Sequence, residues 1–136
     1  MSALTEKVVS AFRANFKHEP SYTILSPGRI NIIGEHVDYN DGFVMPAAIN
    51  KYVCFAIAES GTSQCTLVAL DLDKTYTFNL RDELNPVADM WVNYILGVVS
   101  PLKKQLKGFN IAFSSTIPMG SGLSSSAAVE CGAAFA

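Results

Sequence analysis

The residues from Gly28 to Pro46 constrain the fold of this chain more than any other stretch. Three isoleucines, Ile30, Ile32 and Ile33, form a short apolar run that leads to a glycine, and a dense group of polar residues follows at once. Side chains of an extended strand alternate between its two faces, and a glycine lets the backbone turn away. We therefore predict a buried strand whose end holds a cluster of hydrogen-bonding groups, as suits a ligand rich in hydroxyls.

A second conspicuous segment is a loop of glycine and serine residues. It follows a predicted strand and leads into a predicted helix near Ser124, and its residues are Gly120, Ser121, Gly122, Leu123, Ser124, Ser125 and Ser126. Glycines let backbone N–H groups approach an anion, and a helix N-terminus adds unpaired donors and the positive end of the helix dipole. The segment lacks the lysine of a P-loop, and Ser125 replaces the third glycine of a dinucleotide fingerprint. From these residues alone, a phosphate-binding loop and an ordinary turn with serine caps both stay open.

The remaining pattern predicts an α+β fold. Apolar residues four apart predict a helix over 4–16, and short runs rich in β-branched and aromatic residues predict strands at 22–25, 43–49, 52–58, 66–70, 75–80 and 109–115. We expect a turn at 26–28, a meander of antiparallel hairpins over 52–80, and a helix that opens at Asn85-Pro86, is kinked or restarted at Pro101 and ends at Lys107 and Gly108. Together these elements predict one two-layer domain over 1–136, with a mostly antiparallel sheet and helices on one face.

Composition limits the function classes. The chain has 136 residues, of which 49% are hydrophobic, and this is enough for one domain with a core. A net charge of -2 argues against nucleic acid or an anionic membrane as a partner. No stretch reads as a membrane span or a signal peptide. Three cysteines without zinc-type spacing predict free thiols in a reducing compartment, so we expect a cytoplasmic protein.

The two motifs together resemble those of galactokinases, which belong to the family that also holds homoserine, mevalonate and phosphomevalonate kinases. The first motif, from Gly28 through Gly42, is specific to galactokinases, and the second, from Pro118 through Ala128, marks the family as a whole. The resemblance implies the ribosomal protein S5 domain 2-like fold of their N-terminal domain. It also implies ATP-dependent phosphorylation of the anomeric hydroxyl of α-D-galactose, with Mg²⁺ as cofactor and with galactose and MgATP as the small-molecule partners.

The resemblance also implies roles for single residues. Glu35, His36, Val37 and Asp38 would bind galactose, and carboxylates there would distinguish sugar epimers because a missing hydroxyl leaves a buried acceptor unpaired. Arg29 would lie beside the reacting hydroxyl and stabilise the charge that is transferred. Without the resemblance, Arg29 is as well explained by pairing with a surface acid, and His36 by a structural role.

The second motif receives its roles in the same way. The resemblance implies that residues 120–126 wrap the phosphates of ATP and that Ser126 is a magnesium ligand. Trp91 and Tyr94 have the spacing of core residues, although the similar stretch of galactokinases helps to form the adenine pocket. Glu130 is expected to be a structural or solvated acid.

We expect the chain to be the N-terminal part of a longer kinase. It ends in an apolar, helix-like run from Cys131 to Ala136, and galactokinases are much longer. The catalytic aspartate would then lie downstream, so the 136-residue chain should be inactive alone. It should also self-associate through a helix face around Ala128, Ala133 and Phe135, whereas the full-length protein should be a monomer.

Three alternatives stay open at this point. The full-length protein could phosphorylate N-acetylgalactosamine or another sugar. It could be a regulator that binds galactose and ATP without turnover. The chain could also be a purely structural piece of the kinase fold.

Overall fold

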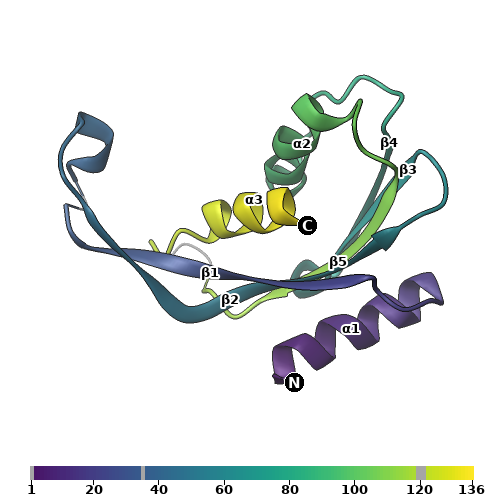
Figure 1. Ribbon diagram of the computed structural model, residues 1–136, viewed down its shortest axis with the longest axis horizontal. Helices are drawn as coiled ribbons and strands as arrows, with labels where there is room; N and C mark the ends of the chain where they lie inside the picture. The colour runs from purple at the N-terminus through teal and green to yellow at the C-terminus, as the bar shows by residue number, and fades with distance from the viewer. Residues whose placement is uncertain (1, 35, 119–121) are drawn as a thin grey trace.

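The computed structural model describes residues 2–34, 36–118 and 122–136. Its elements, in chain order, are α1 (Ala3–Phe16), β1 (Tyr22–Ile33), the 3-10 turn η1 (Asp38–Asn40), β2 (Met45–Glu59), β3 (Gln64–Ala69), the 3-10 turn η2 (Leu70–Leu72), β4 (Lys74–Asn79), α2 (Met90–Leu102), β5 (Phe109–Ser115) and α3 (Ser125–Phe135). The strands form one sheet, and the helices pack against it (Figure 1).

The sheet has the strand order β1-β2-β5-β3-β4. All of its pairs are antiparallel except β3 with β5, so the expected α+β class with a mostly antiparallel sheet is confirmed. The β3–β4 hairpin also forms as expected. The predicted meander over 52–80 is wrong in one respect, because β5 lies between β2 and β3. Parallel strands need a long crossover connection, and here α2 lies within the connection from β3 to β5.

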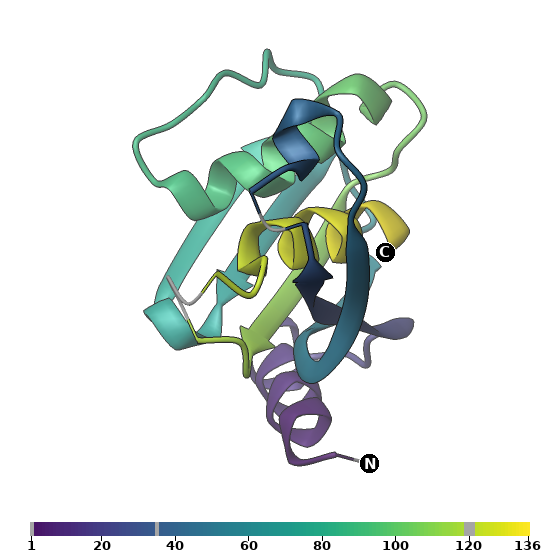
Figure 2. The same cartoon turned by 90° about the vertical axis from the view of Figure 1, so that its left-hand side faces the viewer.

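Helices cover both faces of the sheet rather than one. Figures 1 and 2 show α1 on one side and α2 and α3 on the other. The cause lies in β2, where residues 53–58 are all apolar and buried, so that both faces of the strand need a cover. Cys54 and Ala56 pack towards Phe12 of α1, while Val53 and Phe55 belong to the core beneath α2 and α3.

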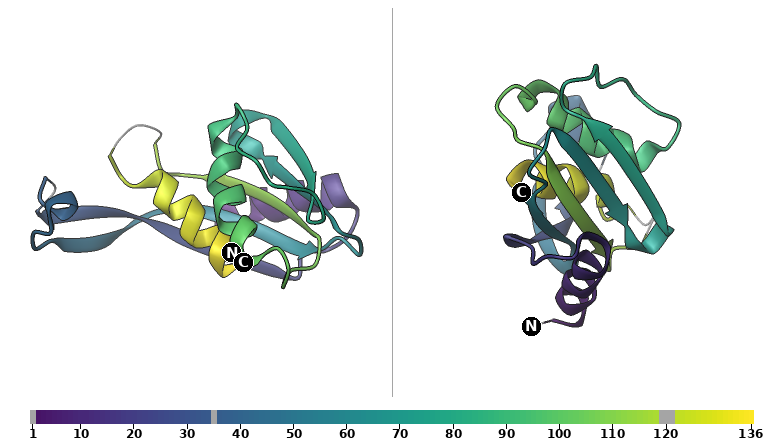
Figure 3. Two further views of the ribbon diagram at one scale, coloured as in Figure 1. Left: turned by 90° about the horizontal axis from the view of Figure 1, so that it is seen from above. Right: turned by 90° about the vertical axis from the view of Figure 1, so that its right-hand side faces the viewer.

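The strands β1 and β2 form a long ribbon that extends beyond the rest of the sheet (Figure 3). The expected turn at 26–28 is instead a shift of register inside β1, between Pro27 and Arg29. Proline has no N–H to donate to the ladder, and an edge strand tolerates this loss. A second shift lies between Asn31 and Ile33, close to Pro46 of β2.

Helix α2 is shorter than expected. It begins at Met90 rather than at Asn85-Pro86, because the Asn93 side chain holds Val87 in a non-helical turn. Asn93 Nδ2 donates to the Val87 carbonyl and Asn93 Oδ1 accepts from the Val87 N–H, each at 2.8 Å. The helix ends at Leu102, one residue after Pro101, and not at Lys107.

Helix α3 lies closely on the sheet. Ala128 is buried there, so the expectation that this residue lies on an exposed face is wrong. Phe135 does project into solvent, with 84% of its surface exposed.

The free thiols that the composition predicts are present in the structure. Cys54, Cys65 and Cys131 are all free, and burial raises the pKa of the Cys54 and Cys65 thiols. Within the described ranges, the helices are too short or too polar to cross a bilayer.

Candidate functional site

The two sequence motifs touch at Arg29. The Arg29 guanidinium donates from Nη2 to Ser124 Oγ at 2.9 Å, and the Arg29 backbone N–H donates to the Leu123 carbonyl at 3.2 Å. Gly28 permits this approach, because a Cβ atom there would lie only 3.0 Å from the Leu123 carbonyl oxygen. The middle of β1 is therefore bonded to the glycine–serine loop, although the two segments are far apart in the sequence.

The described part of the glycine–serine loop leads into α3 in an irregular conformation. Gly122 has a φ of 71° and Ser124 a φ of 57°, both in the left-handed region. Ser124 occupies the N-cap position, yet its side chain makes no capping bond among the described residues and accepts from Arg29 instead. The backbone N–H groups of the first turn of α3 thus keep no side-chain cap from Ser124, which suits them to bind an anion. Gly120 and Ser121 lie outside the described residues.

An apolar cavity of about 300 Å³ adjoins the start of α3. Its lining includes Trp91, Tyr94, Phe113, Ser115, Ser125 and Ser126. Trp91 packs against Phe113, with ring centroids 5.8 Å apart, and its buried Nε1 has no hydrogen-bond partner in the described part of the chain. Mostly apolar walls with a few polar groups at one end are typical of a small-molecule site. Trp91 is therefore both a packing residue, as its spacing predicts, and a wall of this cavity.

A larger depression of about 650 Å³ lies elsewhere, near the end of α1 and the end of α3. Polar residues such as His18, Glu19 and Lys107 line it, and the described part of its lining includes no residue of either motif. The chemistry of the motifs therefore favours the smaller cavity as the site.

The segment 36–38, which holds three of the four expected sugar-binding residues, lies at the tip of the β1–β2 ribbon (Figure 1). The turn needs Gly34, whose φ is 93° and whose added Cβ would lie 2.5 Å from the Phe43 carbonyl oxygen. Val37 organises the tip, since its carbonyl accepts from the N–H groups of Asn40 and Gly42 at 3.1 and 2.8 Å. His36 is exposed, and its Nδ1 lies 3.4 Å from the hydroxyl of a neighbouring tyrosine.

The side chains of two expected sugar ligands are not described by the structure. Asp38 begins η1, but its side chain is outside what the structure describes, and Glu35 lies outside the described residues altogether. The structure thus brings Arg29 to the glycine–serine loop and places the backbone of 36–38 at the tip of the ribbon, away from α3.

The described residues contain no group of three or more histidine, cysteine, aspartate and glutamate side chains that could hold a metal ion. Ser126 is half-buried in the first turn of α3 and faces the cavity. Mg²⁺ keeps several waters and takes only one or two protein ligands beside substrate phosphates, so a lone hydroxyl at this place fits such an ion.

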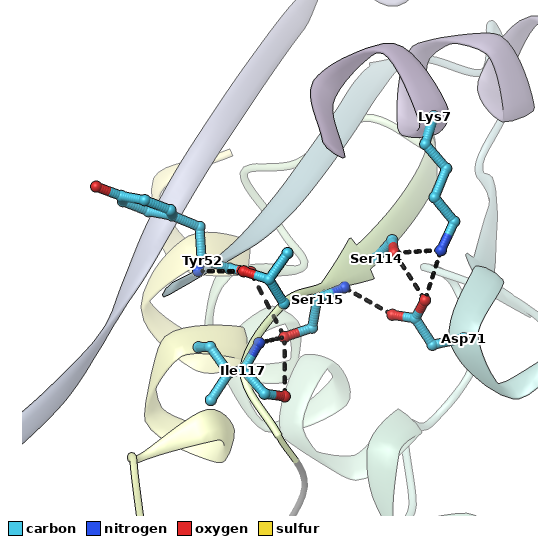
Figure 4. A network of polar contacts seen from close by, with 7 residues as sticks. Lys7, Tyr52, Asp71, Ser114, Ser115 and Ile117 are labelled. Carbon is cyan, nitrogen blue, oxygen red and sulfur yellow. Dashed lines mark hydrogen bonds and ion pairs between the residues drawn. The ribbon is translucent and has the colours of Figure 1, made fainter. Parts of the chain in front are cut away.

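Asp71 is a residue of this region that the sequence did not single out (Figure 4). Its carboxylate accepts from Lys7 Nζ at 2.8 Å, from Ser114 Oγ at 2.7 Å and from the Ser115 N–H at 2.6 Å. Partial burial alone would raise the pKa of Asp71, but these hydrogen bonds and the charge of Lys7 outweigh it and hold the pKa below its usual value. No local pattern signals this role, because the partners lie 64, 43 and 44 positions away.

Comparison with known proteins agrees with this geometry. The family model described as the galactokinase galactose-binding signature matches residues 10–59, and the one described as the GHMP kinases N terminal domain matches residues 93–136. A curated galactokinase from Glaesserella parasuis is 43% identical over 123 residues. The chain matches the N-terminal third of galactokinases. A galactokinase from Haemophilus influenzae is 45% identical over 127 residues. Both matches cover 88% of this chain, which spans about a third (32%) of the length of each curated galactokinase.

Solved structures give the same fold. The galactokinase of Lactococcus lactis, solved with galactose, matches with a TM-score of 0.81 at 32% identity, over 92% of this chain and 34% of that one. The mevalonate kinase of Methanococcus jannaschii matches with a TM-score of 0.70 at 27% identity, over 83% of this chain and 38% of that one. The expected N-terminal fold of these kinases is thus confirmed for this chain.

Proposed function

We propose that this chain supplies part of the sugar site and part of the nucleotide site of an ATP-dependent galactokinase. The full-length enzyme would transfer the γ-phosphoryl group of ATP to the anomeric hydroxyl of α-D-galactose and release galactose 1-phosphate. The contact between Arg29 and Ser124 carries this proposal, because it joins the segment matched by the galactose-binding signature to the loop matched by the kinase model. The likeness to a galactokinase solved with galactose supports the choice of sugar.

On the nucleotide side, the glycine–serine loop and the first turn of α3 would hold the phosphates. The loop residues are Gly120 to Ser126, and their backbone N–H groups would donate to phosphate oxygens. The adenine would enter the apolar cavity beside Trp91, whose buried Nε1 is available as a donor. Ser126 is the candidate ligand for Mg²⁺, and the bound ion would neutralise phosphate charge.

On the sugar side, Glu35, His36, Val37 and Asp38 would bind hydroxyl groups at the tip of the ribbon. Arg29 would stabilise the charge that develops on the phosphoryl group, since its guanidinium already lies at the loop. We assign the acceptor of the sugar proton to the part of the relatives that this chain does not span. We expect the full-length enzyme to be a cytoplasmic monomer without a nucleic-acid or membrane partner.

The test is a coupled ADP-release assay on the full-length protein with MgATP and a panel of sugars. Release that depends on galactose and exceeds release with N-acetylgalactosamine or glucose is the expected result. A preference for N-acetylgalactosamine would change the substrate, and galactose binding without any turnover would make the protein a regulator. The 136-residue chain alone is the control and should release no ADP in response to galactose.

A further inference from the structure

At the end of β5, beside the proposed nucleotide cavity, a side chain rather than a neighbouring strand completes the backbone hydrogen bonding. Strands β3 and β5 pair from Thr66 with Asn110 to Ala69 with Phe113, and β3 ends there. Strand β5 continues for two more residues, so the Ser115 N–H extends past the last residue of its neighbour. Asp71 Oδ2 accepts from this N–H at 2.6 Å and replaces the missing strand carbonyl.

The other carboxylate oxygen fixes Asp71 in place. Oδ1 accepts from Ser114 Oγ at 2.7 Å and from Lys7 Nζ at 2.8 Å, and Lys7 also donates to Ser114 Oγ at 2.9 Å (Figure 4). Lys7 comes from α1, on the face of the sheet opposite α3. Three donors from two elements therefore set the orientation of the carboxylate, and its oxygens are already engaged within the protein.

The opposite edge of the same segment is also held. The Thr116 N–H donates to the Tyr52 carbonyl at 2.9 Å, and Ser115 Oγ accepts from the Ile117 N–H at 2.9 Å. The chain is thus fixed by Asp71 of η2 on one side and by Tyr52 of β2 on the other, just before it enters the glycine–serine loop. Ser115 and Ile117 line the same cavity as Ser126, so any movement here changes the shape of that cavity.

We propose that Asp71 is a positioning residue for the nucleotide, which acts by fixing the end of β5 from which the glycine–serine loop departs. This inference rests on the proposed function. Asp71 belongs to the lining of the cavity, but Lys7, Ser114 and Ser115 already engage its carboxylate oxygens, so we assign it an indirect role that acts through Ser115. Its loss should weaken ATP binding and leave galactose binding unchanged, because the segment 36–38 lies at the tip of the β1–β2 ribbon, away from α3.

The variant Asp71→Asn of the full-length protein tests the inference. Asparagine keeps the shape of the side chain, but one of its ends must be an NH₂ group that faces a donor. We expect the KM for ATP to rise about tenfold, as for the loss of a hydrogen bond to a charged group, with the KM for galactose within about twofold of wild type. Hydrogen exchange at the Ser115 amide should become faster. Asp73→Asn, which changes an exposed carboxylate two positions further on, is the matched control and should leave all three quantities unchanged.

Lys7→Met removes the ion pair but keeps the Asp71 carboxylate, so it tests the two contributions separately. The Lys7 and Asp71 side chains are 53% and 38% exposed, and exposed pairs contribute little, so the KM for ATP should rise only about two- to threefold. An unchanged KM for ATP in Asp71→Asn would overturn the inference, and so would an equal rise for both substrates or the loss of the folded protein. If wild type fails to phosphorylate galactose, the proposed function fails instead. Calorimetric titration of ATP and exchange at Ser115 then still decide the role of Asp71.

Discussion

Replacing Gly132 by alanine should push α3 away from the sheet. An added Cβ at this position would overlap Cε2 of Phe55 and lie 3.0 Å from both Cδ2 of Phe55 and Cβ of Ser26. Phe55 is fully buried and stacks on Phe113 with ring centroids 5.5 Å apart, so its ring has little room to retreat. The helix as a whole must therefore move, and the residues at its start move with it.

Two opposing effects set the change in the free energy of unfolding of Gly132→Ala. Overpacking of a filled core costs about 1–3 kcal/mol, and contact with a confined ring favours the upper end. Alanine gains about 1 kcal/mol over glycine in a helix interior, so the net loss is about 2 kcal/mol. Gly97 in α2 is the matched control, because it is exposed and an added Cβ meets nothing within 4 Å. Gly97→Ala should keep the gain and stabilise the protein by about 1 kcal/mol.

Thermal unfolding of the two full-length variants measures the difference. Gly97→Ala should unfold above wild type and Gly132→Ala several degrees below it. The KM for ATP should also rise in Gly132→Ala, since the N-terminus of α3 carries the glycine–serine loop. A midpoint for Gly132→Ala at or above that of wild type would show that Phe55 can move aside, and the packing argument would then be wrong.

The loop, the arginine, the sugar motif and the carboxylate can be perturbed in the same protein. Gly122→Val should weaken ATP binding in a nucleotide titration without unfolding the protein, because a φ of 71° costs a branched residue about 1–2 kcal/mol while no described residue lies within 4 Å of an added Cβ. An unchanged titration would make the loop a plain turn. Arg29→Met should lower kcat about a hundredfold or more, whereas Arg13→Met, which breaks only a surface ion pair, should not; equal values would remove Arg29 from the reaction. Asp38→Ala should cost about 2 kcal/mol in kcat/KM for galactose, and turnover near the wild-type value would contradict its assignment. The pKa of Asp71 lies below its usual 3.8, so its contribution to stability is complete above that value and is lost as the pH falls through the lowered pKa. The gap in melting temperature between wild type and Asp71→Asn should therefore close as the pH falls below 3.8, and it would stay constant if the carboxylate contributed nothing.

Features with a local cause are predictable from this sequence. The four-residue repeat of Leu4, Val8 and Phe12 predicts α1, and the turn chemistry between 66–70 and 75–80 predicts the β3–β4 hairpin. The glycine–serine loop predicts the start of α3, because its residue types are those that favour a left-handed turn and a helix N-terminus.

Features caused by distant partners are not predictable in this way. The insertion of β5 between β2 and β3 depends on pairing across about half of the chain. The late start of α2 depends on one side chain, Asn93, which bonds to Val87 in competition with the helix. In the candidate site, the motifs point to Arg29 and to the loop separately, but their contact appears only in three dimensions, and Asp71 looks like an ordinary turn residue until Lys7 and Ser115 lie beside it.

The central position of β5 also has a consequence for synthesis on the ribosome. Until residues 109–115 emerge, β1–β2 and β3–β4 can form only two separate hairpins, because β5 is the strand that joins them. At about 5–20 residues per second, the interval between the end of β2 and the end of β5 lasts about 3–11 s. During that time Phe55 and Leu67 have no completed sheet to cover them, and both hairpins present open edges. The nascent chain is therefore most exposed to aggregation in this interval, and a chaperone that holds it there would protect the fold most effectively.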